Sequence, residues 1–447
     1  MKTIKNPFTI LAGKCLALLL LGALLTPEFT YADDSATVQA MINAGTAFPA
    51  GKTYTVSISL LVNKNVNFNG DIINWAGTAG GCLKIQTAGV IVQNGTITGT
   101  WTPTGAYNNA GPSGIVIYAD NVTVSKMTIQ NVTAYGIVVS GARNNPIITY
   151  NKIVNCGYIC FYYDSEAATT GGTFSFNTCD RSQIPPANVH ELAVGIRAVS
   201  SGTTPLTTGW TVNNNTITMP LNPTDWTAEC IEVRTVANCV ISGNTFNQSS
   251  IGVSIARSSG VTVTNNKFSG AQLEAIEIED SKNTATNNNI IAGGIGIGIL
   301  LDGAVGSSNT TITGDNISGM AKDCIQSVAG TNTVKVINAK LSAGTNAKAF
   351  NLIGTTGVTV TGTTMTGNSS AGQMAVYLTN CAGGLTINGA TISNFAKCLV
   401  YISNTTSGMV TNNVNVSGNV VTGVPTALST YLTNGGSVGS AVTVTLK

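Results

Sequence analysis

Most of the charged side chains that could do chemistry lie in one stretch of the chain, between residues 166 and 279. This stretch holds every glutamate of the predicted mature chain, four of its five arginines and the single histidine, His190. Glu232, Arg234 and Glu277 alternate with apolar residues, so one face of each strand would carry charge while the other enters a core. Carboxylates and guanidinium groups gathered on one wall suit acid–base chemistry on an anionic substrate.

The centre of this stretch is built from three near-copies of one unit, which run from Glu229 to Asp280. With Ile231, Val253 and Ile276 as equivalent positions, the copies follow each other at intervals of 22 and 23 residues. If consecutive copies stack as coils, their strands lie about 5 Å apart. Equivalent residues then form columns along the outward face.

Two charged columns are predicted on that face. The first holds Glu232 and Glu277, and the second holds Arg234 and Glu279 with Arg257 beside it. The columns could be a salt-bridge ladder that only keeps the face soluble. Because other coils carry Ser, Thr and Asn at these positions, charge is not needed for folding, which favours a functional role.

The second column is expected to continue towards the N-terminus. Aligning Val194 with Ile231 stacks Arg197 against Arg234, and the coil before is expected to add Tyr162. Stacked arginines can bind a carboxylate through paired hydrogen bonds. The column therefore predicts a binding face for an acidic polymer.

The same unit recurs along most of the chain. Ile115, Ile137 and Ile159 are 22 residues apart, and each copy has short strands of β-branched residues separated by polar turns. Three short strands per coil are the repeat of a β-solenoid, here of about a dozen coils. A recurring asparagine at one tight left-handed turn predicts a ladder of side-chain amides. Its expected members are Asn151, Asn215, Asn244, Asn266 and Asn288.

Two coils are longer than the rest. The steps from Ile159 to Val194 and from Val194 to Ile231 span 35 and 37 residues, which predicts loop insertions at about 164–190 and 200–229. Insertions in a solenoid emerge as loops on one side, and loops on a rigid scaffold often carry function. We expect them to wall the charged face into a cleft.

The first 32 residues are predicted to be a signal peptide. Lys2, Lys5 and Lys14 precede a short apolar run that ends near Ala32. A basic start, a short apolar segment and a small residue for cleavage are typical of export. We therefore expect a single domain over residues 33–447 that is secreted, periplasmic or on the cell surface, without a membrane anchor after cleavage.

Composition excludes several classes of protein. Charged residues make up 9% of the chain and the formal net charge is +2, with no basic patch for nucleic acid. An apolar content of 43% argues against disorder. The nine cysteines after residue 32 lack metal-type spacing; disulfides are possible outside the cytoplasm, but buried thiols are the preferred expectation. The oligomeric state stays open.

The start of the predicted mature chain resembles a known superfamily. Residues 35–42 have the pattern of a short amphipathic helix capped by Ser35, and FPAGKTYTV follows. This arrangement resembles the pectate-lyase-like superfamily. The resemblance implies an all-β, single-stranded right-handed parallel β-helix with a short N-terminal capping helix. These motifs are architectural and name no activity.

A shorter segment resembles the chondroitinase-B and alginate-lyase family. Glu229, Arg234 and Asn238 have that family's spacing, and Arg257 lies on the following coil. The resemblance implies that Arg234 stands at the base position and Glu229 at a calcium position. The chain departs from the family in having Arg where the base is Lys, and Thr227 where a second Glu is expected.

The chemistry that fits best is β-elimination on a polysaccharide of uronic acids, which needs a base and a group that neutralises the sugar carboxylate. A neighbouring Glu stabilises charged Arg, so His190 and Tyr162 are base candidates equal to Arg234. The catalytic candidates are Arg234, Arg257, Glu232, Glu277, His190 and Tyr162. The substrate-binding candidates are Arg197, Glu279, Trp226 and Tyr163. Glu229, Glu277 and Glu279 are the candidate ligands of Ca²⁺.

Two alternatives remain. Paired carboxylates, such as Glu232 with Glu277 or Glu277 with Glu279, would suit a glycoside hydrolase or transferase. A non-catalytic adhesin would bind glycans on the same face without turnover. The products distinguish the three: a lyase forms unsaturated sugar ends, a hydrolase forms new reducing ends alone, and an adhesin forms neither.

Overall fold

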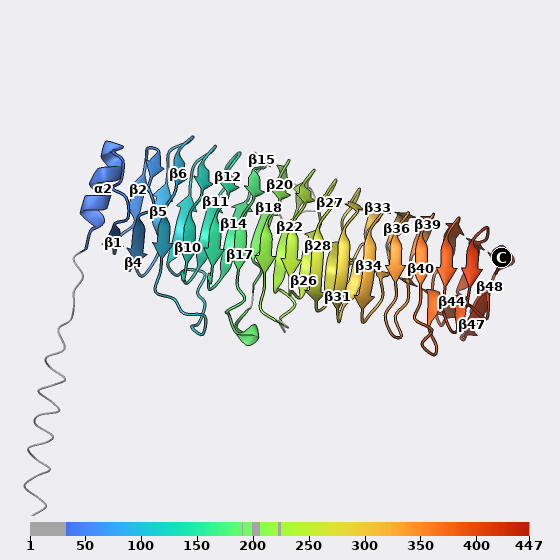
Figure 1. Ribbon diagram of the computed structural model, residues 1–447. Coiled ribbons are helices and arrows are strands. Elements are labelled where there is room, and N and C mark those ends of the chain that lie inside the picture. Colours follow the sequence, from blue (N-terminus) through green and yellow to red (C-terminus); the bar gives the residue numbers. More distant parts are fainter. Residues whose placement is uncertain (1–32, 190, 199–205, 222–224, 447) are drawn as a thin grey trace, which may run out of the picture.

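The computed structural model describes residues 33–189, 191–198, 206–221 and 225–446. The predicted signal peptide and His190 lie outside these ranges. The chain forms one elongated β-solenoid with a short helix at its N-terminal end (Figure 1). No helix among the described residues is long and apolar enough to cross a membrane.

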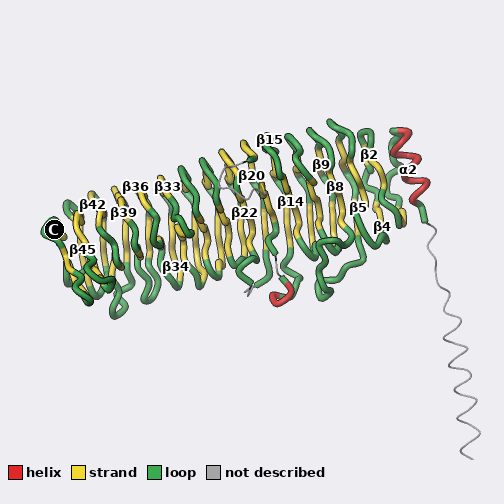
Figure 2. Tube along the Cα trace, turned by 180° about the vertical axis from the view of Figure 1, so that it is seen from behind, coloured by secondary structure: helices red, strands yellow, loops and turns green. Residues whose placement is uncertain are grey.

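Three parallel sheets run the length of the solenoid. Each coil gives one strand to each sheet in turn, so β1 (Thr53–Val56) pairs with β4 (Ile72–Trp75) of the next coil. The first sheet extends from β1 to β46 (Val420–Thr422) and the third from β3 (Val66–Asn67) to β48 (Ser437–Val438). The rows of strands and the turns between them are seen from behind in Figure 2. The predicted architecture is confirmed, with somewhat more coils than the expected dozen.

The second sheet carries the charged face. It contains fifteen strands in the order of the chain. These strands are β2 (Leu60–Val62), β5 (Gly81–Ile85), β8 (Ser113–Ile117), β11 (Tyr135–Ser140), β14 (Ile159–Ser165), β18 (Val194–Ala198), β22 (Glu229–Arg234), β26 (Ile251–Ala256), β29 (Glu274–Glu279), β32 (Ile297–Asp302), β35 (Ile325–Ser327), β38 (Phe350–Ile353), β41 (Met374–Thr379), β44 (Cys398–Asn404) and β47 (Leu428–Leu432).

Helix α2 (Ser35–Ala44) covers the N-terminal end of the core. Val38 and Ile42 are buried, and the helix ends at Gly45 in the left-handed conformation. Ser35 was expected to cap this helix, but it is the first helical residue. Asp34 occupies the N-cap position, but its side chain does not cap the helix, since its carboxylate accepts a hydrogen bond from Thr55 N at 2.9 Å.

The interior is apolar and holds the cysteines as well. Inward-facing Ile, Val, Leu and Phe side chains form one continuous core. All nine cysteines of the described chain are buried free thiols, as expected. Such stacked aliphatic columns let each coil bury a face that it could not bury alone.

An amide ladder runs through one corner of the core. From Asn177 onwards, each ladder Asn accepts on Oδ1 from the backbone N–H and the side-chain amide of the Asn one coil before, as between Asn215 and Asn244 at 2.9 Å for both bonds. One expected member was wrong: Asn289, not Asn288, belongs to the ladder. Asn288 instead takes the left-handed turn, with φ of 53°. The left-handed residue precedes the ladder member in each coil, so the expectation that the ladder asparagines themselves adopt this conformation was wrong. Asp315 ends the run.

Three long loops leave the same edge of the solenoid (Figure 1). Their described residues are 99–112, 181–189 with 191–193, and 219–221 with 225–228, and each loop precedes a strand of the second sheet. The predicted insertions at 164–190 and 200–229 include regular strands, among them β17 (Thr178–Asp180) and β21 (Thr216–Thr218). The loop at 99–112 was not predicted. It is anchored by buried Trp101, whose indole donates to Ala106 O at 3.0 Å.

Candidate functional site

The strand register brings the predicted columns together on the second sheet. Glu232 of β22 aligns with Ser254 of β26, which aligns with Glu277 of β29. In the neighbouring column, Arg197 of β18 aligns with Arg234. That column continues through Ala256, Glu279 and Asp302. Both predicted columns are therefore confirmed as a register.

The position expected for Tyr162 was wrong by one column. Tyr162 aligns with Gly195 and thus with Glu232, whereas Asp164 aligns with Arg197. The error comes from a register shift of two residues on β14, a strand that is longer than its neighbours: Ile137 aligns with Phe161, not with Ile159 as the repeat predicted. Tyr162 still lies close to Arg197, whose guanidinium carbon is 5.8 Å from the centre of its ring.

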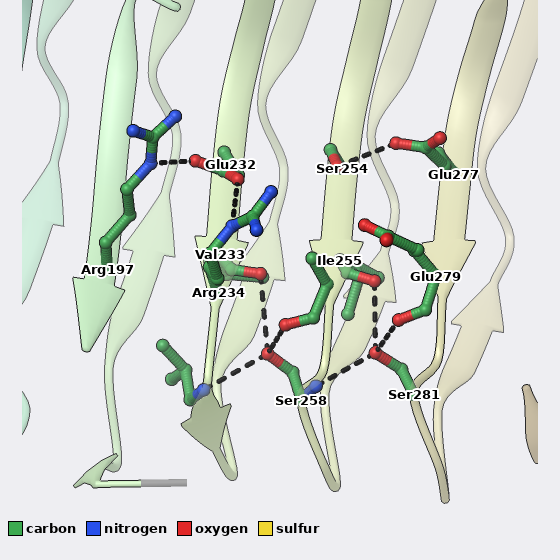
Figure 3. A network of polar contacts seen from close by, with 12 residues as sticks. Arg197, Glu232, Val233, Arg234, Ser254, Ile255, Ser258, Glu277, Glu279 and Ser281 are labelled. Atoms are coloured by element: carbon green, nitrogen blue, oxygen red, sulfur yellow. Dashed lines mark hydrogen bonds and ion pairs between the residues drawn. The ribbon is translucent and has the colours of Figure 1, made fainter. Parts of the chain in front are cut away.

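Two arginines share one buried carboxylate at the head of the site. Arg197 Nε pairs with Glu232 Oε2, and Arg234 Nε donates to Glu232 Oε1 at 2.7 Å (Figure 3). The Glu232 side chain is 1% exposed, whereas the arginine side chains are 27% and 35% exposed. We call these three residues the arginine–glutamate triad. It carries two positive charges for one negative charge.

The triad changes the roles that the sequence suggested. Burial acts to lower the pKa of Arg234, but the charge and hydrogen bond of Glu232 more than offset it, and the pKa is raised. The same balance raises the pKa of Arg197. This pairing favours the protonated form of Arg234, which argues against the base role that the family resemblance implied. Glu232 is sealed between the arginines, so it holds the two guanidinium groups in place and presents almost no surface to the cleft.

A cleft of about 370 Å³ opens beside the triad. Ser254 of β26 lines its floor, in register between Glu232 and Glu277, and the small Ala256 holds the equivalent position between Arg234 and Glu279. The close view shows this gap between Arg234 and Glu279 (Figure 3). The lining residues are Trp226, Glu229, Arg234, Ser254, Glu277, Glu279, Asp302 and Gly303.

Glu277 is the side chain in the cleft best suited to proton transfer. Burial raises its pKa to about 7, helped by the negative charges of Asp302, Glu279 and Glu232. Ser254 Oγ donates to Glu277 Oε2 at 2.8 Å, which opposes the rise. A carboxyl group with a pKa near neutrality can both accept and donate a proton at physiological pH.

Other acids around the cleft have raised pKa values as well. Burial raises the pKa of Asp302 to about 6 and that of Glu274 to about 7. Glu229 is 4% exposed, and burial followed by the charges of Glu232 and Glu277 raises its pKa well above normal. Below neutral pH the cleft therefore loses much of its negative charge.

A row of tyrosines leads along the same face to the triad. Tyr135 stacks on Tyr162 with ring centres 5.6 Å apart, and Tyr158 meets the edge of Tyr135 at 5.3 Å. Tyr107, from the loop at 99–112, stacks on Tyr158 at 5.5 Å. Tyr158 OH also donates to Glu191 Oε1 at 3.1 Å. Aromatic rings on a polar face are suited to contacts with sugar rings.

Two predicted site residues lie away from the cleft. Tyr163 was expected to bind substrate, but it is buried in the core, where its hydroxyl is 2.6 Å from Thr169 Oγ1. It points inward because side chains alternate along β14. Arg257 occupies a left-handed turn with φ of 50° and lines a separate hollow with Asp280 and Lys282. It is therefore not part of the shared patch that the sequence suggested.

The remaining candidates are placed as follows. Trp226, with 63% of its surface exposed, stands at the rim of the cleft, and Glu279 lies in its wall. His190 lies outside the described residues, and its proposed role stays a prediction. Arg197 is part of the triad.

The predicted calcium ligands do not form a metal-type cluster among the described residues. Within the described ranges, no three His, Cys, Asp or Glu side chains converge as a metal ion requires. Glu229, Glu277 and Glu279 all line the cleft without gathering around one point. Calcium binding therefore stays a prediction, and no catalytic step below involves a metal.

Sequence reasoning missed two acids of this face. Asp302 ends the strand IGILLD, and extending the columns by one further coil would have placed it beside Glu279. Asp164 would have appeared beside Arg197 with the correct register of β14. Ser254 was noted in its column, but its hydrogen bond to Glu277 depends on side-chain conformation.

Comparison with known proteins supports the architecture. Residues 187–341 match the family model described as "Right handed beta helix region". The protein is a right-handed parallel β-helix. The superfamily resemblance is thus confirmed at the level of architecture, and the resemblance to alginate lyases is consistent with it. No curated protein sequence matches the chain.

Several solved structures are similar in shape. Tailspike protein 3 of bacteriophage CBA120 has 10% identity and a TM-score of 0.47, covering 94% of this chain and 61% of its own. The chain therefore spans less than two thirds of that tailspike. The A-module of mannuronan C-5 epimerase AlgE6 from Azotobacter vinelandii has 16% identity and a TM-score of 0.45, covering 92% and 95%. The surface adhesin PfbA of Streptococcus pneumoniae has 13% identity and a TM-score of 0.43, covering 84% and 90%. These values are too low to transfer a substrate or a residue role.

Proposed function

We propose that this β-helix is an exported enzyme that cleaves an acidic polysaccharide by β-elimination. The observation that carries the proposal is the arginine–glutamate triad, which has one positive charge in excess beside a cleft with acid–base carboxyl groups. A uronate carboxylate would supply the missing negative charge. Arg197 and Arg234 each keep N–H donors that Glu232 does not use.

A sugar unit would lie over the floor of the cleft, above Ser254 and Ala256. Neighbouring strands are about 4.8 Å apart, so the coils of Arg234 and Glu277 are separated by roughly 10 Å. Long side chains from both coils can therefore reach the same sugar. Trp226 at the rim offers an exposed ring for contact with the polymer.

The chemical step uses one carboxyl group twice. The Glu277 carboxylate removes the proton from C5, and the triad stabilises the charge that develops on the sugar carboxylate. The electron pair forms the C4–C5 double bond, and the C4–O4 bond breaks. Glu277 returns the proton to the departing O4, so atoms and charge balance. A pKa of about 7 suits a residue that must act in both directions.

The carboxyl groups also favour a second candidate, a glycoside hydrolase. Glu277 with a pKa of about 7 would be the acid, and Asp302 with a pKa of about 6 would be the base or nucleophile. This mechanism does not use the excess positive charge of the triad. We therefore place it second.

Product analysis tests the proposal. The protein would be incubated with alginate, polygalacturonate and chondroitin sulfate, with ultraviolet detection of unsaturated ends and a separate assay for reducing ends. We expect the unmutated protein to form unsaturated ends. These ends should disappear in Glu277→Gln and Arg234→Ala and persist in the control Glu166→Gln. Glu166 is exposed and does not line the cleft.

The other outcomes are equally specific. Reducing ends without unsaturation would replace the lyase with the hydrolase. Binding without any product would leave a glycan-binding protein, and full activity in Glu277→Gln would refute the assigned role.

A further inference from the structure

A second group of aromatic and cationic side chains lies further along the same sheet. Tyr377 of β41 and Tyr401 of β44 align in register, and both continue the column that holds Glu232 and Glu277. Their ring centres are 5.4 Å apart. The rings therefore sit on the outward face of the solenoid, C-terminal to the cleft.

Two lysines are held over these rings. Lys397 Nζ lies 3.8 Å from the centre of the Tyr401 ring, and Lys348 Nζ lies 5.7 Å from the centre of the Tyr377 ring. A ring face attracts an ammonium group and so limits the positions that a flexible lysine samples. Less conformational freedom is then lost when an anion binds.

The two ammonium groups differ in their partners. Lys348 Nζ lies 3.4 Å from Asp323 Oδ1, so one carboxylate balances its charge, while its other N–H groups remain for an added anion. No ion pair to Lys397 is found within the described part of the chain. Both lysines can therefore offer N–H donors to an added anion.

The charge distribution of the C-terminal third supports the same conclusion. Residues 303–446 contain five lysines, two aspartates, and no arginine or glutamate. One of the aspartates, Asp315, is buried in the amide ladder and the other is Asp323 beside Lys348. The segment is thus positive overall, in contrast to the acid-rich coils of the cleft.

We propose that Tyr377, Tyr401, Lys348 and Lys397 form a distal subsite that binds the anionic groups of an acidic polysaccharide. The proposal deepens the function proposed above, because the subsite would hold the same polymer chain that enters the cleft. Four coil steps separate Glu277 from Tyr377, which corresponds to roughly 19 Å along the solenoid axis. A polymer lying along the sheet would engage both sites, and a short oligosaccharide only one.

Affinity electrophoresis in gels containing alginate tests this subsite. The background is Glu277→Gln, so that the polymer is not consumed, and gels with neutral dextran report interactions that do not depend on charge. Lys397→Ala and Lys348→Ala are expected to weaken binding to alginate by about fivefold each, the upper range for one exposed ion pair. Tyr401→Leu should weaken it too, by releasing Lys397 from its position.

Matched controls use lysines on the other two sheets. Lys335 of β36 (Asn332–Ile337) and Lys340 of β37 (Lys340–Ser342) are exposed on the third and first sheets. Lys335→Ala and Lys340→Ala remove the same charge and are expected to leave binding unchanged. If they weaken binding as much as Lys397→Ala, net charge explains the effect and the subsite is refuted.

The remaining outcomes separate the subsite from the proposed function. The subsite is overturned if Lys397→Ala binds alginate as tightly as the Glu277→Gln background protein. It is also overturned if alginate does not retard the background protein in the gel. If the Lys397 and Lys348 variants lose binding while the unmutated protein forms no unsaturated product, the subsite is supported and the lyase is overturned. If the unmutated protein forms unsaturated product and the lysine variants bind alginate normally, the lyase is supported and the subsite is overturned.

Discussion

Ser254 offers a sharp test of the acid–base role of Glu277. Its hydroxyl donates to Glu277 Oε2 at 2.8 Å, and this hydrogen bond holds the pKa of Glu277 lower than burial alone would allow. Ser254→Ala removes the donor with little change in volume. The charged form of Glu277 loses a stabilising contact, so its pKa is expected to rise above its present value of about 7.

The size of the change follows from the energy of such a bond. A hydrogen bond to a charged group is worth about 1.5–3 kcal/mol, and one pKa unit corresponds to about 1.36 kcal/mol. Because Glu277 is partly exposed and water can replace some of the lost contact, we expect a rise of about one unit. In the proposed mechanism, kcat/KM increases with pH as Glu277 ionises, so the acidic limb moves up by the same amount.

The assay is the pH dependence of kcat/KM for Ser254→Ala on the polymer identified by product analysis. Ser269→Ala is the control, since Ser269 bonds to Asn247 on the first sheet, away from the cleft. An acidic limb that stays in place, or moves down, would refute the assignment of this limb to Glu277. A direct titration of the Glu277 carboxyl carbon by NMR gives the same comparison without turnover.

Three further predictions concern stability. Glu232→Ala leaves two partly buried arginines without their shared carboxylate. We expect it to lower the free energy of unfolding by about 2–4 kcal/mol. An unchanged denaturant midpoint would contradict the triad. Tyr163→Phe is expected to cost about 1–2 kcal/mol without changing KM, whereas a changed KM would return Tyr163 to the substrate. The pKa of buried Asp315 is raised to about 6. The stability that the protonated Asp315 side chain contributes is therefore fully present below about pH 4 and is lost as pH rises through 6. Asp315→Asn should therefore stabilise by up to about 3 kcal/mol at pH 8 and little at pH 4, and an equal effect at both would disprove the raised pKa.

The solenoid could be predicted because its signal is repeated along the chain. One coil with period-2 alternation is weak, but repeated intervals such as those from Ile231 to Val253 to Ile276 make the register redundant. The same redundancy gave the correct stacking of Arg197 on Arg234. Where a coil is longer, as at β14, the register shifted and Tyr162 was placed in the wrong column.

The chemistry of the site was harder to predict from the sequence. Alternation cannot show that Glu232 lies between two guanidinium groups, because that depends on side-chain conformation and burial. It also gave no measure of the environment that raises the pKa of Glu277. Tyr163 was misplaced for a simpler reason: it is inward-facing by the same alternation that places Tyr162 outside.

The most direct test of the account is a crystal structure of Glu277→Gln with a bound acidic oligosaccharide. The account predicts a sugar unit above Ser254, with its carboxylate hydrogen-bonded to the guanidinium of Arg234 and its C5 facing residue 277. A sugar bound elsewhere, or one whose carboxylate points to solvent away from Arg197 and Arg234, would contradict it.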